Sequence, residues 1–488
     1  MPKKLSSHLE ENLAVLNDMF GTSGDFYAKK IAIDGVPAAI VLFDNLAGLQ
    51  GLWTIALDRI SHTHMTQRLQ ALGGGESLYT YLMEQTDIPA EQTPVQTVED
   101  AVTMMTAGFA LLMLEDVDKA LAFSVQTLKY RSVQTPSAEG NMRGSREGFC
   151  EVLRVNISLL RRLLRTPDFV AETIQSDTSL KTEYALCYDR KAADPAKVKA
   201  LKDRLAQANP PVLLDSSYFV PWLKIRGIRL FSPVGYTERP AVAAAKIQEG
   251  KILVMVNGSP SALIVPYLFI ENFTCLDDYA GPAYFAALLR ILKIFSFFLT
   301  ITLPGIFISA AAYTPELIPA ELLYKIAAAE QGTPLPLFAE MLLVILVLEI
   351  IREAGLRMPD SLGNSVSLVA ALIVGDAAIS AGVLSTYVIL VAAVTSIAMF
   401  VTPSLYEPAS VLRVLFLVAG GLAGPVGIAA VSIFALLALS TPEILDTSYM
   451  TMLMPMKHSL WVDGLLRKKL PDLAQHEQTR QPGKGEEI

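Results

Sequence analysis

The sequence has few cysteines, an acidic rather than basic balance, and no apolar run at its N-terminus. Cys150, Cys187 and Cys275 lie far apart, which argues against a CxxC metal or redox site and is typical of a reducing compartment. A formal net charge of −8 argues against general nucleic-acid binding. Residues 1–11 carry no apolar stretch and are not expected to act as a secretory signal. We therefore expect the polar N-terminal region to be cytosolic.

Motifs for nucleotide binding and catalysis are also missing. There is no P-loop, so no ATP-driven pump is indicated, and the glycines at 73–75 are interpreted as a turn. His62 and His64 have no third metal ligand at a suitable spacing. No nucleophile–base pattern stands out. We expect no enzymatic activity, no cofactor and no metal site.

Charged residues are unevenly distributed along the chain. Residues 1–282 contain 60 Asp, Glu, Lys and Arg, residues 283–440 contain 15, and the last 48 contain 13. One membrane span needs about 20 apolar residues, so the charge-poor block is long enough for several. The pattern predicts an α+β soluble N-terminal region followed by an α-helical transmembrane domain of four to five spans. We place soluble subdomains at 1–140 and 141–282, the transmembrane domain at 283–440 and a polar tail at 441–488.

The soluble region contains two copies of one pattern. In the first copy, a helix closed by glycine precedes the strands Phe109–Leu114 and Ala120–Val125. In the second, a helix closed by glycine precedes the strands Ile252–Val256 and Ser261–Val265. Glycine after a helix supplies the left-handed cap. We interpret the copies as two related α/β subdomains; the alternative is a chance similarity of two common α+β units.

Other segments of the soluble region also have readable patterns. Lys30–Val41 predicts a hairpin around Asp-Gly, and helices are predicted over Leu46–Leu72 and Glu76–Gln85. The proline-rich stretch Ile88–Pro94 is predicted to be a loop. Glu147–Arg165 is predicted to be a helix with several arginines. This helix either presents a solvated face or contacts an anionic headgroup or a neighbouring subunit.

Five apolar segments are candidate spans. They are Ile294–Tyr313, Leu335–Ile351, Leu362–Ser380, Val383–Thr402 and Val411–Leu439. The loop after the first is acidic and the loop after the second is basic, which places the N-terminal region inside. Five spans would put the tail outside. If the short second segment lies only at the interface, four spans remain and both ends are inside, and the sequence leaves this open.

A few polar residues inside the spans are candidates for function. Asp376 stands alone in the third segment, and an isolated carboxylate in lipid costs about 2.5–3.5 kcal/mol. It either lines an ion path or lies near the span end. Ser361, Asn364 and Ser365 give the start of this segment a polar character and are candidate ion-path residues. Glu349 is expected to pair locally with Arg352.

The fifth segment has a face of small residues around Gly420 and Gly424, followed by Pro425. Such faces let helices approach closely. Tight packing within one subunit and a moving hinge are both compatible with this pattern.

Several separated motifs resemble the A subunit of bacterial spore germinant receptors, the GerA family. They are Gly144-Ser-Arg-Glu-Gly-Phe149, Asn156 with Leu160-Arg-Arg162, Tyr236-Thr-Glu-Arg-Pro240, Asn257-Gly-Ser-Pro260, Pro315-Glu-Leu-Ile-Pro319 and Arg352-Glu-Ala-Gly-Leu-Arg-Met-Pro359. The resemblance covers roughly residues 15–445. Three residues, Ser145, Ala241 and Asp376, depart from those usual in the family. The segment around Thr402 is more similar to a family paralogue that is encoded with the stage V sporulation proteins and resembles stage V sporulation protein AF.

The resemblance implies a protein of the spore inner membrane. It implies a homo-oligomer, a pentameric ring enclosing a cation channel, that works with a transporter-like B subunit and a lipoprotein C subunit in nutrient-triggered germination. Candidate contacts between subdomains or subunits are Arg146, Glu147, Glu238, Arg239, Arg352 and Glu353. The alternatives are a non-conducting scaffold that organises the receptor complex, and a secondary transporter. The transporter is less favoured because transporters usually carry their repeats in the membrane part.

Overall fold

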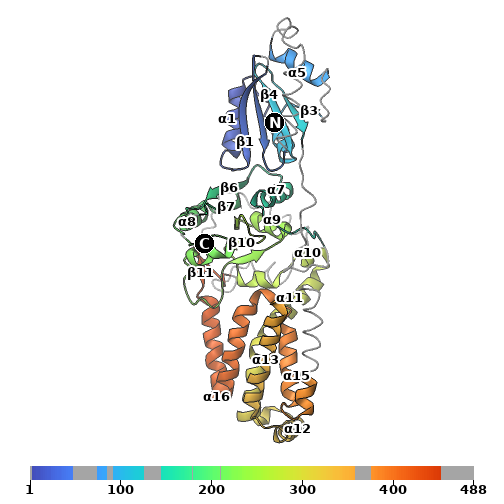
Figure 1. The fold of residues 1–488 in the computed structure, drawn as a ribbon, viewed down its shortest axis with the longest axis vertical. Helices are drawn as coiled ribbons and strands as arrows, with labels where there is room; N and C mark the ends of the chain where they lie inside the picture. Colours follow the sequence, from blue (N-terminus) through green and yellow to red (C-terminus); the bar gives the residue numbers. More distant parts are fainter. Residues whose placement is uncertain are drawn as a thin grey trace.

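The computed structural model describes residues 3–33, 35–47, 74–84, 92–125, 144–177, 180–208, 210–357 and 375–451. The molecule is elongated, with two sheet-containing units at one end and a bundle of helices at the other (Figure 1). We call the described residues up to 125 the first unit, residues 144–268 the second unit, and residues 283–440 the bundle. Most of the predicted helix Leu46–Leu72, with His62 and His64, lies outside the described residues.

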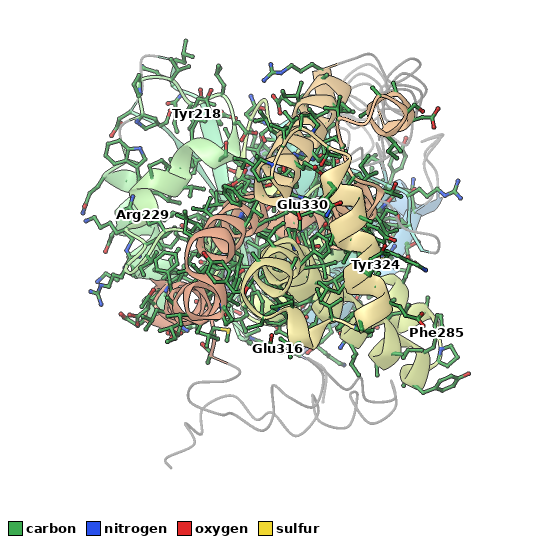
Figure 2. All side chains as sticks on the ribbon, turned by 90° about the horizontal axis from the view of Figure 1, so that it is seen from below. Tyr218, Arg229, Phe285, Glu316, Tyr324 and Glu330 are labelled. Atoms are coloured by element: carbon green, nitrogen blue, oxygen red, sulfur yellow. The ribbon has the colours of Figure 1, made fainter. Side chains whose placement is uncertain are left out.

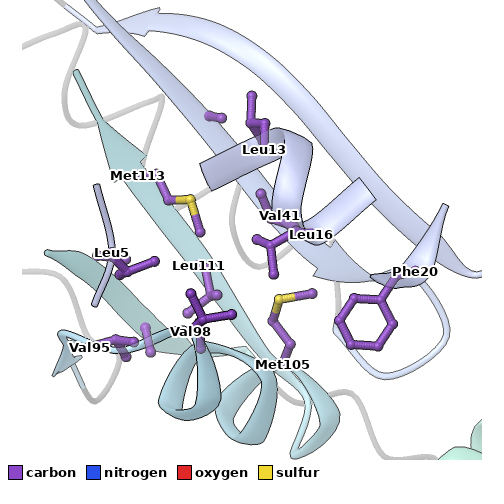
Figure 3. Packing of buried hydrophobic residues seen from close by; sticks show 14 of the residues in the cluster. Leu5, Leu13, Leu16, Phe20, Val41, Val95, Val98, Met105, Leu111 and Met113 are labelled. Atoms are coloured by element: carbon purple, nitrogen blue, oxygen red, sulfur yellow. The ribbon is translucent and has the colours of Figure 1, made fainter. Parts of the chain in front are cut away.

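The first unit is an antiparallel sheet covered on both faces. Its helices are α1 (Leu9–Phe20), α5 (Gly75–Glu84) and α6 (Val98–Thr106), and its strands are β1 (Phe26–Ile33), β2 (Val36–Phe43), β3 (Gln92–Val95), β4 (Phe109–Leu114) and β5 (Ala120–Ser124). The strand order is β1-β2-β4-β5-β3. Helices α1 and α6 cover one face around Leu16, Met105 and Leu111 (Figure 3). Helix α5 covers the other face through Leu78 and Leu82.

The second unit repeats this order of elements. It contains α7 (Leu153–Leu163), β6 (Phe169–Gln175), β7 (Glu183–Asp189), α8 (Pro195–Ala206), the 3-10 helix η2 (Ser216–Leu223), β8 (Gly235–Thr237), α9 (Pro240–Gln248), β9 (Ile252–Val256) and β10 (Ala262–Val265). Its strand order, β6-β7-β9-β10-β8, matches that of the first sheet strand for strand. The two predicted helix-and-hairpin copies are therefore the cores of two sheets with one topology.

Two local expectations in the soluble region have different outcomes. The hairpin is present: Ile33 of β1 pairs with Val36 of β2, and Gly35 adopts a φ of +86° in the two-residue turn. The predicted loop Ile88–Pro94 is wrong in its last part, because β3 forms there. Pro94 is tolerated because β3 is an edge strand that pairs with β5 alone.

The bundle follows the second unit through the short helices η3 (Phe269–Phe273) and α10 (Asp277–Ala280). It contains α11 (Ala283–Tyr313), η4 (Pro315–Leu317), α12 (Ala320–Gln331), α13 (Leu337–Arg357), α15 (Thr386–Met399), η5 (Pro403–Leu405) and α16 (Tyr406–Ser440). One apolar cluster joins Phe297, Met399 and Leu412 next to the second unit, and we call this end proximal. Another joins Ile308, Ile326 and Val388 at the opposite, distal end.

Helix α16 is a hairpin of two helices rather than one straight rod. Gly424 has φ +57° and ψ −139°, which breaks the helix between its two limbs. Phe416 of the first limb and Ala435 of the second lie in the same proximal cluster, so the chain reverses direction at the glycine. Figure 1 shows the limbs side by side in orange and red. This differs from the predicted single span Val411–Leu439.

The chain after α16 returns to the second unit. Strands β11 (Glu443–Ile444) and β12 (Thr447–Ser448) form a small ribbon there. Ile444 and Leu445 are buried in the core of the second unit beside Leu223 and Val234. The N-terminal units and the described part of the tail therefore lie at the same end of the bundle.

Two helical segments of the described residues are long and apolar enough to cross a membrane, Ala283–Tyr313 and Pro403–Ser440. Thr386–Met399 is a shorter apolar helix. Helix α13 contains most of the second candidate span, Leu335–Ile351. It lies along the bundle axis in Figure 1, and not across the axis as a helix at the membrane interface would. Each limb of α16 has fewer than 20 residues, or about 25 Å of helix, which is close to the thickness of a bilayer core.

Candidate functional site

Asp376 lies on the outside of the bundle. It belongs to a helical turn at 375–380 that leads to Gly382 at the distal end, and its side chain is exposed. Asp376 forms no hydrogen bond or ion pair with the residues that the structure describes. The other candidate ion-path residues, Ser361, Asn364 and Ser365, lie outside the described residues. A carboxylate on this outer face is available to water or to a neighbouring molecule.

Glu340 is the buried carboxylate of the distal end. It lies in the first turn of α13 and is fully buried. Its Oε2 accepts a hydrogen bond of 2.9 Å from the backbone N–H of Ser385, the N-cap residue of α15. The positive end of the α15 dipole therefore stabilises this carboxylate. Its Oε1 has no hydrogen-bond partner among the described residues.

Glu349 and Arg413 form an ion pair between α13 and α16 at the proximal side, in which Arg413 is buried and Glu349 is partly exposed. Tyr406 donates its hydroxyl to the same carboxylate, and Ser410 Oγ lies 3.3 Å from Glu349 Oε1. The guanidinium of Arg352 stacks on the Tyr406 ring, 2.9 Å from its centroid. The expected local pair of Glu349 with Arg352 is therefore replaced by a pair between helices. Arg413 Nε has no hydrogen-bond partner in the described part of the chain.

The remaining predicted contact in the bundle is local. Glu353 accepts hydrogen bonds from Arg357 one turn later on α13, and both side chains are more than half exposed. Exposed pairs of this kind contribute little to stability. Within the described residues, Glu353 therefore does not join α13 to another helix, whereas Arg352 does so through Tyr406.

Small residues let α11 pack closely against α16. A Cβ on Gly305 would lie 2.4 Å from the carbonyl oxygen of Phe416, and one on Gly420 would lie 2.5 Å from that of Gly305. At the reversal, a Cβ on Gly424 would lie 2.6 Å from the Tyr313 ring. Tyr313 donates its hydroxyl to the carbonyls of Gly421 and Leu422 at 3.0 and 2.8 Å. The small-residue face thus packs within one subunit and also permits the reversal.

Two ionic networks hold the segment 269–282, which links the second unit to the bundle. In one, Arg290 of α11 donates to Asp278 at 2.8 Å, and both side chains are buried. In the other, Glu271 accepts from Lys246 and Lys251 at 2.7 and 3.3 Å. Burial alone would raise the pKa of Glu271, but Lys251 and Lys246 offset this and hold the pKa below its usual range. The same carboxylate raises the pKa of Lys246 against the effect of burial.

The predicted contacts of the soluble region gather at one loop of the second unit. Arg239 is buried and donates to the carbonyl of Ser145 at 2.8 Å, and the Glu238 carbonyl accepts from Phe149 N–H at 2.7 Å. Glu147 pairs with Arg162 of α7. Arg146 is exposed. The structure therefore brings the 144–150 loop to the start of α9, within a single unit.

Arg161 joins the two soluble units. From the sequence, its helix was expected to present the arginines to solvent, to a lipid headgroup or to a neighbouring subunit. Arg161 of α7 is fully buried and donates to Asp25 from Nε at 3.1 Å and from Nη2 at 2.8 Å. It also donates to Ser23 Oγ at 2.8 Å and to the Phe169 carbonyl at 2.9 Å. Its guanidinium lies between the rings of Phe43 and Phe169. Arg161 therefore joins the units instead of binding a headgroup.

The predicted helix Glu147–Arg165 is also shorter than expected, because α7 begins only at Leu153. The sequence carries a signal for the role of Arg161. It follows Ile157 by four residues and thus falls on the buried stripe with Leu153 and Leu160. Exposed Arg154, by contrast, makes a peripheral contact of 3.0 Å with Asp44 of the first unit.

The second unit also has an open cavity of about 650 Å³ at one end of its sheet. Its lining mixes polar and apolar side chains from the β6–β7 hairpin, the β9–β10 turn and the segment before η2. The lining residues are Gln175, Leu180, Lys181, Thr182, Glu183, Leu213, Leu214, Asn257 and Gly258. The described residues contain no group of three or more His, Cys, Asp or Glu placed to hold a metal ion.

Comparison with known proteins identifies relatives over nearly the whole chain. The family described as Bacillus/Clostridium GerA spore germination protein matches residues 14–479. Spore germination protein KA of Bacillus subtilis is 30% identical, and the alignment covers 96% of this chain and 85% of that protein. Spore germination protein GerLA of Bacillus cereus is 28% identical, with 98% and 97% covered.

The chain is also similar to a solved structure. It is the crystal structure of the N-terminal domain of the A subunit of the Bacillus megaterium spore germinant receptor GerK3. That domain is 23% identical, and the match covers 55% of this chain and 98% of that chain with a TM-score of 0.44.

Proposed function

The chain belongs to the GerA family of spore germination proteins, and on this premise we propose that it is an A-type, channel-forming subunit of a germinant receptor. The proposed complex is a homo-oligomeric ring, with five copies as the expected number, that conducts cations after a nutrient signal. The proposed partners are a transporter-like B subunit and a lipoprotein C subunit. On this proposal the chain catalyses no reaction.

The proposed location is the spore inner membrane, with both soluble units on the cytosolic side. The apolar helices Ala283–Tyr313 and Pro403–Ser440 support a membrane position. Because the chain returns to the second unit after α16, we further propose an even number of membrane crossings. On this proposal the two limbs of α16 count as two crossings of opposite direction, whereas the counts of four and five expected from the sequence treat α16 as one.

The single observation that carries the channel proposal is the exposed carboxylate of Asp376. Its position on the outside of the bundle gives it no ionic partner among the described residues of its own chain. One copy cannot enclose an ion path with an outward-facing carboxylate, but a ring of copies can place several of them around an axis. A ring of carboxylates is a recurrent feature of cation-selective pores.

The test is cation flux through the purified full chain in liposomes. Asp376→Asn is expected to lower cation conductance severalfold and to weaken selectivity for cations over anions, whereas Asp376→Glu retains both. Glu321→Gln on α12 is the matched control, because it removes an exposed distal carboxylate that is not assigned to the path. Unchanged conductance and selectivity in Asp376→Asn would contradict the role of Asp376.

The second candidate is a non-conducting scaffold that organises the receptor complex. It is favoured by the apolar side chains exposed along the start of α11, such as Tyr284, Leu288 and Phe295, which suit contact with lipid or a partner helix. A scaffold predicts no flux from any variant, together with normal assembly. The oligomeric state of the purified protein separates the two candidates further, since a monomer excludes a ring-shaped pore.

A further inference from the structure

A short segment at the base of the second unit exposes both basic and apolar side chains. We call residues 222–230 the basal segment. Lys224, Arg226 and Arg229 are exposed along it. Trp222 and Ile228 are 38% and 36% exposed, which is high for large apolar side chains of a folded unit. Cations combined with an accessible tryptophan are typical of segments that lie at a membrane surface.

The basal segment lies against the proximal end of α16. The Arg226 N–H donates to the Glu443 carbonyl at 3.0 Å, and the Glu443 N–H donates back at 3.1 Å. Ile228 N–H donates to Thr441 Oγ1 at 3.2 Å. Gly227, with φ +92°, lets the two backbones meet, since a Cβ there would lie 2.2 Å from the Thr441 carbonyl oxygen. The segment is therefore fixed at the level where the apolar helix ends.

The end of the basal segment is anchored from inside. Phe231, the next residue, is buried with Phe297 of α11, and Leu230 packs against the same cluster. The exposed side chains project outward from this anchor. Seen from below in Figure 2, Arg229 and Tyr218 lie at the left, beyond the outline of the helices. The second unit therefore overhangs the bundle here, and its underside faces the region that lipid headgroups occupy around the helices.

The three cations are only partly neutralised by the described part of the protein. Arg226 lies 3.9 Å from Asp446, and both of these side chains are largely exposed, so the attraction is weak. Lys224 donates to the neutral amide oxygen of Gln207 at 3.2 Å. Arg229 has no ion pair within the described residues. With Asp446 counted against the three cations, a local positive charge of about two units remains next to the ends of the apolar helices.

We propose that the basal segment binds the headgroups of anionic phospholipids, with Lys224, Arg226 and Arg229 against the phosphates and Trp222 at the interface. The inference rests on the membrane position proposed above. We expect each cation to enrich anionic lipid next to the basal segment about fivefold over the surrounding membrane at low salt. Because these charges are exposed, the effect weakens as the ionic strength rises.

The test uses Trp222 as its own reporter in the full-length protein. The chain has three tryptophans, so Trp53→Phe with Trp461→Phe leaves Trp222 alone. This protein is reconstituted in vesicles of phosphatidylcholine and phosphatidylglycerol, in which one lipid at a time is brominated on the part of its chains nearest the headgroup. Brominated phosphatidylglycerol is expected to quench Trp222 more strongly than brominated phosphatidylcholine at the same mole fraction.

Two further variants identify the cause of this preference. Replacing Lys224, Arg226 and Arg229 together by glutamine should abolish it. The matched control replaces Lys4, Arg165 and Lys199 by glutamine, which removes the same charge from exposed positions elsewhere and should leave the preference intact. Equal quenching by both lipids, or the same loss in both triple variants, would overturn the proposal.

A fourth protein separates this inference from the membrane position. Phe298→Trp, placed on the exposed side of α11 in a background without other tryptophans, reports insertion of the bundle. If the tryptophan introduced on α11 is quenched and Trp222 is not, the basal segment faces water or a protein, and the lipid proposal fails while the membrane position stands. If neither is quenched, both fail.

Discussion

The junction between the two soluble units and the interior of the bundle both bury charge, but they satisfy it differently. Arg161 at the junction has ionic, hydroxyl and carbonyl acceptors and two flanking rings. In the bundle, Arg413 Nε and Glu340 Oε1 lack hydrogen-bond partners among the described residues. A buried charged group whose hydrogen-bonding atoms have partners stabilises one arrangement. A buried group with an unpartnered atom can lower its free energy by rearranging or by binding a new partner. We therefore expect the soluble units to act as one body and the helices to be the part that changes.

The largest expected effect comes from breaking the junction. Arg161→Ala leaves Asp25 buried without its cation, and removing one partner of a buried pair costs about 3–5 kcal/mol. The free energy of unfolding of the purified full chain should fall by this amount in urea titrations. Arg154→Ala, which removes the exposed partner of Asp44, is the control and should cost less than about 1 kcal/mol. Similar losses in both variants would show that the buried pair is not the dominant link.

The next effect is expected at the reversal in α16. Gly424→Ala places a side chain at φ +57° and drives its Cβ toward the Tyr313 ring. We expect a loss of about 3 kcal/mol in the free energy of unfolding, near the upper end for a strained backbone conformation. Gly281→Ala is the control, since nothing lies within 4 Å of its Cβ. A stable, correctly assembled Gly424→Ala protein would argue against a fixed reversal.

A smaller effect is expected from the pair between α13 and α16. Glu349→Gln keeps the shape of the side chain but leaves Arg413 without a counter-charge. Because Glu349 is 30% exposed, we expect a loss of about 2 kcal/mol in thermal unfolding experiments. Glu353→Gln, at an exposed local pair on the same helix, should be nearly neutral. On the channel proposal, if opening separates these helices, Glu349→Gln should also raise basal cation flux, whereas Glu353→Gln should not.

The smallest effect is a pH dependence at the network between the second unit and η3. The pKa of Glu271 is lowered in the folded protein, so its stabilisation is present above the unfolded-state value of about 4.3 and is lost as the pH falls through the folded value. Glu271→Gln should lower the melting temperature near neutral pH. It should also make the melting temperature decrease less steeply as the solution is acidified. Glu249→Gln, which removes an exposed partner of Lys246, is expected to leave the acid profile unchanged.

The soluble fold was largely predictable because its signals are local. Glycine at the helix ends and the alternation of short apolar runs with turns mark the two helix-and-hairpin copies. The edge strand β3 was missed because Pro94 suggests a loop, and only its place at the sheet edge makes the proline acceptable. Strand order and the match between the two sheets depend on pairing between distant segments, which local patterns do not contain.

The candidate site was less predictable because its partners come from different helices. Nothing near Glu349 in the sequence points to Arg413, and a pairing rule based on one helix face selects Arg352 instead. The reversal at Gly424 is similar, since glycine followed by proline is compatible with packing, a kink or a turn until the neighbouring helix is known. The outward position of Asp376 is likewise a property of the packed bundle.

The return of the chain after α16 has a consequence for biosynthesis. Ile444 and Leu445 complete the core of the second unit, yet the ribosome makes them after every helix of the bundle. While the helices are being made, the second unit lacks part of its interior, including the hydrogen bond from Lys197 to Thr447. The last step of its folding therefore follows the synthesis of the helices. A chain truncated after Ser440 should retain all its apolar helices and still expose an unfinished core, which an added protease would detect.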